Sequence, residues 1–218
     1  MLDHPMPFKP RLRGVWHQWA AITAVPLGLA LVVMAEGARA RVAVGIYALS
    51  LVALFGVSAT YHRVNWRTLR ARLWMRRLDH SMIFLLIAGT YTPFAMIALH
   101  GTVAFALMLA VWGLALVGIV LNLVWTDAPK WLLTGFYIAL GWTAAGALPE
   151  LGKSIGLTAL ALMVMGGACY SVGAIIYATK RPDPAPAVFG YHELFHVLTI
   201  VAAALQYAVI AFWVLPNS

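Results

Sequence analysis

The sequence predicts an all-α membrane protein with seven transmembrane helices, an N-terminus in the cytoplasm and a C-terminus outside. Three observations predict this fold: charged residues are scarce, seven apolar runs are long enough to cross a bilayer, and Lys and Arg gather on alternate sides of these runs. Of the 218 residues, 63% are hydrophobic and only 10% are charged, whereas about 25% are charged in an average soluble domain. So little charge leaves no surface for water, which indicates that the solvent is lipid.

The apolar runs define the expected spans. A transmembrane helix needs roughly 20 apolar residues, and seven runs qualify, at about 15–35, 42–61, 79–99, 102–125, 131–148, 155–178 and 191–215. They are expected to be helices, because lipid cannot hydrogen-bond exposed backbone groups and no alternating strand pattern appears. The chain therefore divides into a cytoplasmic tail, 1–14, and a seven-helix transmembrane domain, 15–215. The first run is interpreted as a retained span, because no small-residue cleavage site follows it.

The positive charges orient the spans. Three Lys or Arg precede the first run, six follow the second, one follows the fourth and two follow the sixth, whereas only three lie on the other side. Cytoplasmic loops carry the excess of Lys and Arg, so the N-terminus is predicted inside. Because these charges are clustered in gaps, the net charge of +8 does not indicate nucleic-acid binding. The basic segment 63–77 is either a short helix in the headgroup layer or an ordinary basic loop.

Two features of the runs concern helix packing. In the third run Pro93 follows two threonines, Thr90 and Thr92. Proline removes a helical hydrogen bond, so we expect a kink there, with threonine hydroxyls bonding the freed carbonyls. In the fifth and sixth runs, four small residues are expected to let neighbouring helices approach closely: Gly141, Gly146, Gly166 and Gly167.

Ionisable residues enter the spans mainly at one membrane depth. The second span runs from outside to inside, so His62 lies at its cytoplasmic end. The third and seventh spans start inside, which places Asp79, His80 and His192 at cytoplasmic ends, with His196 about 6 Å deeper. Ionisable groups within a span are costly and are typical of functional sites. The sequence therefore predicts that helices two, three and seven meet at a site near the cytoplasmic face.

The residue types at this depth predict a metal site. His192 and His196 are four residues apart and share a helix face, as do Ser58 and His62. Three neutral imidazoles suit zinc and leave a fourth position open for water, as in catalytic zinc sites. Zinc lowers the pKa of such a water towards 7, so that a nearby carboxylate can take its proton. Asp79 is the candidate carboxylate, and Ser58 is expected to orient the water or a substrate carbonyl.

Other ionisable residues receive a different interpretation. Three further histidines are interpreted as amphipathic anchors at the membrane interface: His4, His17 and His100. His80 either joins the site or points to another face of its helix. The segment 192–196 matches the H-E-x-x-H motif of soluble zinc proteases, in which the glutamate is the general base. It opens a membrane span here, so Glu193 is ranked behind Asp79 as the base.

These motifs together resemble the hemolysin III family of bacterial membrane proteins, which is related to the progestin and adipoQ receptors and so to the adiponectin receptors. The resemblance covers nearly the whole chain. It is carried by Arg13-Gly14 with His17, Ser58-x3-His62, Leu78-Asp79-His80-Ser81, Ala88-Gly89-Thr90-Tyr91-Thr92-Pro93 and Gly190-Tyr191-His192-Glu193-Leu194-Phe195-His196. The resemblance implies a seven-helix fold in the bacterial plasma (inner) membrane and a zinc ion near the cytoplasmic face. It implies that His62, His192 and His196 bind the zinc, that Asp79 holds the metal's water, and that Ser58 lies beside it.

The resemblance leaves three functions open. The wider superfamily includes ceramidase-like membrane hydrolases, which implies zinc-dependent hydrolysis of a lipid amide or ester, with membrane lipids as partners. A second possibility is a sensor or receptor of membrane state in which the zinc is structural. A pore, as the family name implies, is disfavoured, because a water-filled path needs polar residues along its whole length.

Overall fold

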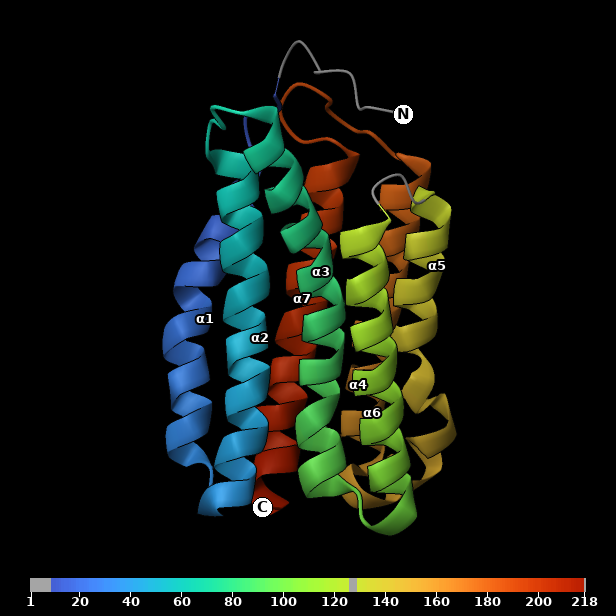
Figure 1. The fold of residues 1–218 in the computed structure, drawn as a ribbon. Coiled ribbons are helices and arrows are strands. Elements are labelled where there is room, and N and C mark those ends of the chain that lie inside the picture. Colours follow the sequence, from blue (N-terminus) through green and yellow to red (C-terminus); the bar gives the residue numbers. More distant parts are fainter. Residues whose placement is uncertain (1–8, 126–128, 218) are drawn as a thin grey trace.

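The computed structural model describes residues 9–125 and 129–217 (Figure 1). This part of the chain is helical and contains no β-strand, which confirms the all-α prediction. Its α-helices are α1 (Val15–Met34), α2 (Gly37–Arg63), α3 (Leu69–Pro93), α4 (Gly101–Val124), α5 (Lys130–Gly141), α6 (Leu148–Thr179) and α7 (Tyr191–Val209). Short helical turns follow α3 (Phe94–Ala98), α5 (Thr143–Ala147) and α7 (Ile210–Val214 and Leu215–Asn217).

Six helical stretches among the described residues are long and apolar enough to cross a membrane. Five of them correspond to single expected spans, namely Val15–Met34, Gly37–Arg63, Leu69–Ala98, Gly101–Val124 and Tyr191–Val214. The sixth, Trp131–Thr179, is 49 residues long and contains both the fifth and the sixth expected spans. Large apolar side chains cover the outside of the bundle, as expected where lipid is the solvent, including Val33, Leu49, Phe105 and Leu157.

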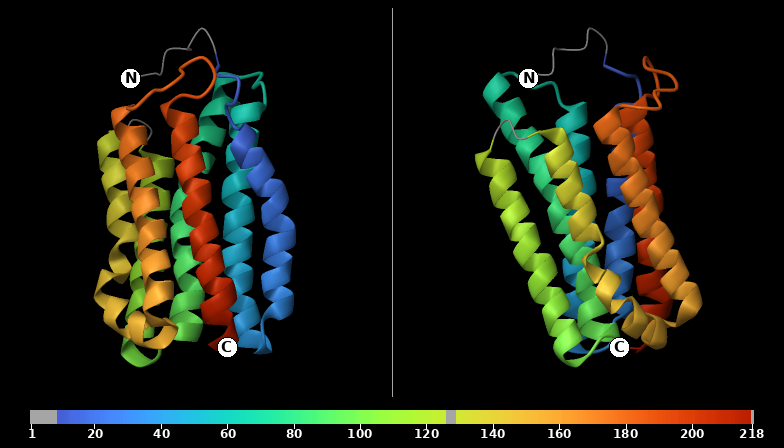
Figure 2. Two further views of the ribbon diagram at one scale, coloured as in Figure 1. Left: turned by 180° about the vertical axis from the view of Figure 1, so that it is seen from behind. Right: turned by 90° about the vertical axis from the view of Figure 1, so that its right-hand side faces the viewer.

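The helices form one bundle in which neighbours in sequence run antiparallel (Figures 1 and 2). Short connections favour this arrangement, since consecutive elements then pack side by side. α2 packs between α1 and α3, and α7 lies between α6 and α1 (Figure 2). The end of α2 and the beginnings of α3 and α7 therefore meet at the end of the bundle where α1 begins.

The basic segment 63–77 fits neither of the two sequence-based alternatives. Its second half is the beginning of α3, which runs from Leu69 without interruption to Pro93. The Thr68 side chain caps this helix by accepting a hydrogen bond from the Ala71 N–H at 3.2 Å. Only residues 64–68 form a connection, so the arginines after them extend α3 beyond the apolar run and do not form a separate helix.

Pro93 is the last residue of α3, but the chain stays helical after it. The hydroxyls of Thr90 and Thr92 donate to the carbonyls of Leu86 and Ala88 at 2.7 and 2.9 Å. Pro93 frees the carbonyl of Gly89, so these bonds are not the ones expected from the sequence. The helix then continues as a wider turn, in which the Leu99 N–H bonds the Phe94 carbonyl at 3.0 Å. The backbone therefore stays hydrogen-bonded past the proline.

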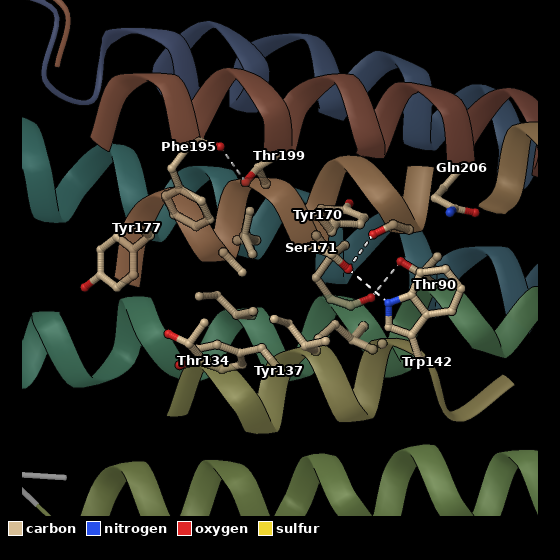
Figure 3. A pocket seen from close by; sticks show the side chains of 18 of the residues that line it. Thr90, Thr134, Tyr137, Trp142, Tyr170, Ser171, Tyr177, Phe195, Thr199 and Gln206 are labelled. Atoms are coloured by element: carbon tan, nitrogen blue, oxygen red, sulfur yellow. Dashed lines mark hydrogen bonds between the residues drawn. The ribbon is translucent and has the colours of Figure 1, made fainter. Parts of the chain in front are cut away.

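An elongated cavity lies among α3, α5, α6 and α7 (Figure 3). Its lining is mostly apolar and includes Ile83, Leu86, Ile87, Leu133, Ile138 and Val164. Tyr177 lies at one end, and Gln206, Thr90 and Trp142 lie at the other (Figure 3). The first end also carries Asp79, His192 and His196. The cavity therefore leads from the predicted histidine site into the membrane-spanning part of the bundle.

Close packing of α2 on α3 gives a test of the fold. A Cβ added at Gly89 would lie 2.7 Å from the Cβ of Ser50, so Gly89→Ala should push the two helices apart. We expect a loss of about 1–3 kcal/mol of stability, the usual cost of overpacking. The matched control is Gly113→Ala on α4, where nothing lies within 4 Å of an added Cβ. Thermal unfolding in detergent should separate the two variants, and an equal effect of both would contradict this packing.

Candidate metal centre

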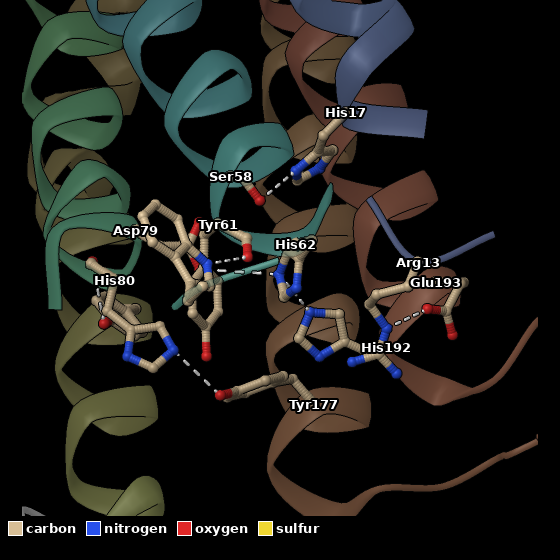
Figure 4. A network of polar contacts seen from close by, with 12 residues as sticks. Arg13, His17, Ser58, Tyr61, His62, Asp79, His80, Tyr177, His192 and Glu193 are labelled. Carbon is tan, nitrogen blue, oxygen red and sulfur yellow. Dashed lines mark hydrogen bonds and ion pairs between the residues drawn. The ribbon is translucent and has the colours of Figure 1, made fainter. Parts of the chain in front are cut away.

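Three buried histidines converge at the end of the bundle where α2 ends and α7 begins, and Figure 4 shows two of them, His62 and His192, side by side. His62 lies in the last turn of α2, and His192 and His196 lie one turn apart on α7. Their ring centroids are 4.6 to 5.1 Å apart in the three pairs. Their exposed fractions are 6%, 9% and 2%. The predicted meeting of these side chains is therefore present in the structure.

The arrangement fits a metal ion. Zinc–nitrogen bonds of about 2.0–2.1 Å in a tetrahedral site place two nitrogens roughly 3.3 Å apart. The Nε2 atoms of His62 and His192 are 3.1 Å apart, and one nitrogen of each histidine lies within 4.8 Å of the other two. The Nδ1 of His196 is buried and has no hydrogen-bond partner in the described part of the chain. A divalent ion that accepts imidazole would satisfy these nitrogens together.

Asp79 and Ser58 both border the histidines. Asp79, in α3, places Oδ2 3.9 Å from the Nε2 of His62. Ser58 lies one turn before His62 on α2, and its side chain also interacts with Asp79. Both residues line the apolar cavity. A carboxylate and a hydroxyl thus line the cavity next to His192 and His196.

His17 was expected to be an interfacial anchor, and that prediction is wrong. Only 2% of His17 is exposed, because its ring stacks on His196 with a centroid distance of 3.7 Å. Its Nδ1 forms a 2.8 Å hydrogen bond with the Ser58 hydroxyl. It therefore supports both a histidine and the serine of the site. Its depth in the first span, close to the cytoplasmic end, was the signal that could have placed it in the cluster.

The other two expected anchors differ from His17. His100 is exposed at the N-cap of α4, while His4 lies outside the described residues. His80, which the sequence left undecided, lines the cavity and lies 3.2 Å from the Tyr177 hydroxyl through its Nε2. The Tyr177 ring in turn contacts His192 edge-on, at a centroid distance of 5.5 Å. His80 and Tyr177 therefore form a second polar pair on the cavity side of the histidines.

The comparisons with known proteins agree with the motifs. A family model described as Haemolysin-III related matches residues 7–207. The chain belongs to the haemolysin-III-related family. It is 30% identical to Hemolysin-3 of Bacillus cereus over 208 residues, which cover 94% of this chain and 91% of that protein. The resemblance inferred from the sequence motifs is confirmed, and this haemolysin-III-related chain is a multi-pass membrane protein.

More distant relatives extend beyond bacteria. The chain is 24% identical to the monocyte to macrophage differentiation factor of Homo sapiens over 194 residues, covering 88% of this chain and 78% of that protein. It is 26% identical to the heptahelical transmembrane protein ADIPOR2 of Oryza sativa subsp. japonica over 183 residues, covering 76% and 79%. These matches bear out the predicted link to the adiponectin receptors.

In the haemolysin-III-related chain, the Glu193 side chain caps α7 and pairs with Arg13, and neither of these bonds is to a histidine. It is fully buried, and its Oε2 accepts the Gly190 N–H at 2.9 Å, which caps the helix. Its Oε1 accepts a 2.5 Å charged hydrogen bond from the Nε of Arg13 (Figure 4). Both carboxylate oxygens are thus engaged on the side away from the cavity. This arrangement agrees with the ranking made from the sequence, in which Asp79 is preferred to Glu193 as the candidate general base.

The segment before α1 forms part of the site. The N–H groups of Arg11 and Leu12 donate to the carbonyls of Ala187 and Val188 at 3.1 and 3.2 Å, which holds the segment against the α6–α7 connection. Gly14 then turns the chain into α1 with φ +76°. A Cβ at Gly14 would lie 2.6 Å from the Cβ of His62. Glycine is therefore required both by its conformation and by the nearness of His62.

This contact gives a test of the site. Gly14→Ala should displace His62 and lower the amount of metal bound per chain. Gly37→Ala is the matched control, because Gly37 has φ +73° but nothing within 4 Å of an added Cβ. Both variants carry the same backbone strain, of order 1 kcal/mol. Elemental analysis of the two purified proteins should find the metal reduced only in Gly14→Ala; equal metal content in both would refute this role of Gly14.

Proposed function

We propose that the protein is a zinc-dependent hydrolase of a lipid amide or ester that acts at the cytoplasmic face of the bacterial plasma (inner) membrane and contributes to membrane lipid homeostasis. One observation carries the proposal: two of the three clustered histidines, His192 and His196, line an elongated apolar cavity inside the bundle together with the carboxylate of Asp79. A metal centre gives the means of hydrolysis, and an apolar cavity gives room for a lipid chain. Ceramidase-like hydrolases of the wider superfamily supply the analogy for the reaction.

The proposed topology has seven crossings, with the N-terminus inside and the C-terminus outside. Its spans are those expected from the sequence, after a cytoplasmic tail of residues 1–14. The 49-residue stretch Trp131–Thr179 would cross twice, since α5 and α6 run side by side in opposite directions (Figure 1). The name heptahelical of the rice relative supports this count. The excess of Lys and Arg at the end of the bundle that carries the histidines supports the orientation.

In this proposal His62, His192 and His196 hold the zinc through neutral imidazole nitrogens. A bound zinc ion supplies Lewis acidity, which makes water a better nucleophile and polarises a carbonyl. Asp79 accepts the proton that the attacking water loses, and later donates a proton to the leaving group. Ser58 orients the water or the substrate carbonyl, with its own hydroxyl held by His17.

The substrate would enter from the bilayer. Trp142 and Ala145 line the cavity and are also exposed on the outside of the bundle. The cavity therefore reaches the lipid-facing surface near the turn between α5 and α6. A lipid could pass its chain through this opening while its amide or ester lies at the histidines, and water would reach them from the cytoplasm.

A membrane-state sensor with a structural metal is the second candidate. It is favoured by the position of the histidines, which join the end of α2 to the beginning of α7. In this case the metal would fix the relative position of helices and the cavity would bind a regulatory lipid. A pore remains the least favoured function, since the elongated cavity has an apolar lining.

Substitutions at the site separate these functions. His196→Ala should lower bound zinc from about one ion per chain to near zero, because three protein ligands are needed. Asp79→Asn should keep the zinc but slow lipid hydrolysis by at least about 10²-fold, the usual contribution of a general base. The control His100→Ala should retain both, because His100 is exposed and lies on α4. Elemental analysis and a lipidomic assay of purified protein give the two measurements.

Two results would reject the hydrolase. Stoichiometric zinc without cleavage of any lipid in the assay would favour the sensor. An unchanged cellular phenotype of Asp79→Asn would also favour the sensor, since a structural metal site does not need that carboxylate.

The topology has a separate test. Alkaline phosphatase fused after the last residue should be active, because seven crossings place the C-terminus outside, and green fluorescent protein at the same position should stay dark. Fusions after Pro182, between α6 and α7, should give the opposite pair of results. Fluorescence from the C-terminal fusion would rule out seven crossings with the N-terminus inside.

A further inference from the structure

The far end of the apolar cavity carries two polar groups with unused hydrogen-bonding capacity. The Oε1 atom of Gln206 and the hydroxyl of Tyr170 are buried and have no hydrogen-bond partner among the described residues. Both side chains line the cavity (Figure 3). Buried polar groups are almost always paired, and an unpaired one is costly. Two such groups in the lining of one cavity therefore indicate a hydrogen-bonding ligand group.

The orientation of Gln206 is fixed by its surroundings. Its Nε2 donates to the Met163 carbonyl at 2.9 Å, which leaves Oε1 as the acceptor that faces no protein donor. A Cβ at Gly166 would lie 2.8 Å from that Nε2, so α6 has a glycine where the amide approaches. The acceptor is thus held in place and is not a mobile surface group.

Other polar side chains near this end have satisfied their hydrogen bonds within the protein. The hydroxyl of Thr90 donates to Leu86, that of Tyr91 to Gly141, and that of Ser171 to Gly167, while the Trp142 indole donates to Ser171. The oxygen atoms of the cavity lining that are buried without any partner in the described part of the chain are therefore those of Gln206 and Tyr170. Together they suit a ligand hydroxyl, which donates to Oε1 and exchanges a second hydrogen bond with the phenol.

The distance to the histidines sets where this hydroxyl lies on a ligand. Gln206 follows His196 by ten residues on α7, which is about 15 Å along the helix. An extended chain advances roughly 3.5 Å for every three bonds, so this length corresponds to about a dozen bonds. The cavity between the two ends is apolar.

We propose that the cavity selects a lipid acyl chain that carries a hydroxyl about a dozen bonds from its carbonyl carbon. The carbonyl lies at the histidine end, and the hydroxyl is bound by Gln206 and Tyr170. This inference rests on the proposed function for the identity of the ligand as an acyl lipid, and it names the substrate class of that site. The alternative occupant is an ordered water bridging the two groups.

Three acids that differ only in the presence or position of one hydroxyl give a direct test. Oleic acid and ricinoleic acid share a chain, and the latter carries its hydroxyl at the required distance; α-hydroxyoleic acid carries it beside the carboxyl group. Full-length protein in detergent is incubated with an equimolar mixture, and the bound acids are extracted and measured by mass spectrometry. We expect ricinoleic acid to be preferred about tenfold over both others, the effect of one or two buried hydrogen bonds.

The variants assign the preference to residues. Gln206→Leu and Tyr170→Phe should each lower the preference towards one without weakening oleic acid binding. Tyr170→Phe removes only a hydroxyl that lacks a partner, so it should fold normally even if Gln206→Leu does not. The matched control is Tyr47→Phe, because Tyr47 is buried outside the cavity with its hydroxyl 3.4 Å from the Ala203 carbonyl. It should retain the full preference.

Equal binding of the three acids to wild type, or an unchanged preference in Tyr170→Phe, would overturn the proposal and favour the bridging water. The result does not depend on turnover, because the acids are bound and not cleaved. A preference for ricinoleic acid without any hydrolase activity would sink the hydrolase and leave the selective cavity standing. Hydrolysis of oleoyl and ricinoleoyl amides at equal rates, together with equal binding of the acids, would support the hydrolase and overturn the selective cavity.

Discussion

Lipid offers no hydrogen bonds, and this constraint decides where each polar side chain of the bundle lies. Hydroxyls within the helices bond the carbonyls of their own helix, as seen for Ser50, Thr60, Thr90, Thr92, Ser171 and Thr179. Ionisable side chains, which cannot be satisfied in this way, gather at the end of the bundle that carries the histidines, where helices from distant parts of the chain meet, whereas the unpaired atoms of Gln206 and Tyr170 lie along the cavity. The histidine cluster is therefore the place where the chain concentrates polar groups that need a partner from outside.

One face of α7 links the parts of the site. His192, His196, Thr199 and Gln206 follow one another at helical spacing along this face, from the metal centre to the far end of the cavity. α6 can lie close to this face because Gly166 and Gly173 leave room for Gln206 and Phe195. A ligand in the cavity would therefore contact the same helix at the metal and at its far end. The spacing of these residues on one rigid helix would then set the length of the ligand chain and the position of its polar groups.

The sequence predicted the depth of the site better than its details. Charge asymmetry and apolar length gave the helices and put His62, His192 and His196 at one level, because these properties depend only on distance along the chain. Side-chain partners depend on how helices rotate about their axes, which apolar runs do not specify. Of the four glycines expected at close contacts, Gly166 has one, whereas Gly141 and Gly146 have nothing within 4 Å of an added Cβ and Gly167 has only an ordinary contact.

The largest miss, His17, follows from the same limit and changes how the site is understood. It was interpreted alone, as a histidine at an interface, although the chain from Arg13 to His17 places three groups at the cluster. Arg13 neutralises the buried Glu193, Gly14 approaches His62, and His17 stacks on His196 and bonds Ser58. The chain before α1 and the first turn of that helix thus contact both elements that carry the three histidines. The site is therefore completed by the N-terminal segment, and its geometry depends on residues that have no direct part in holding a metal.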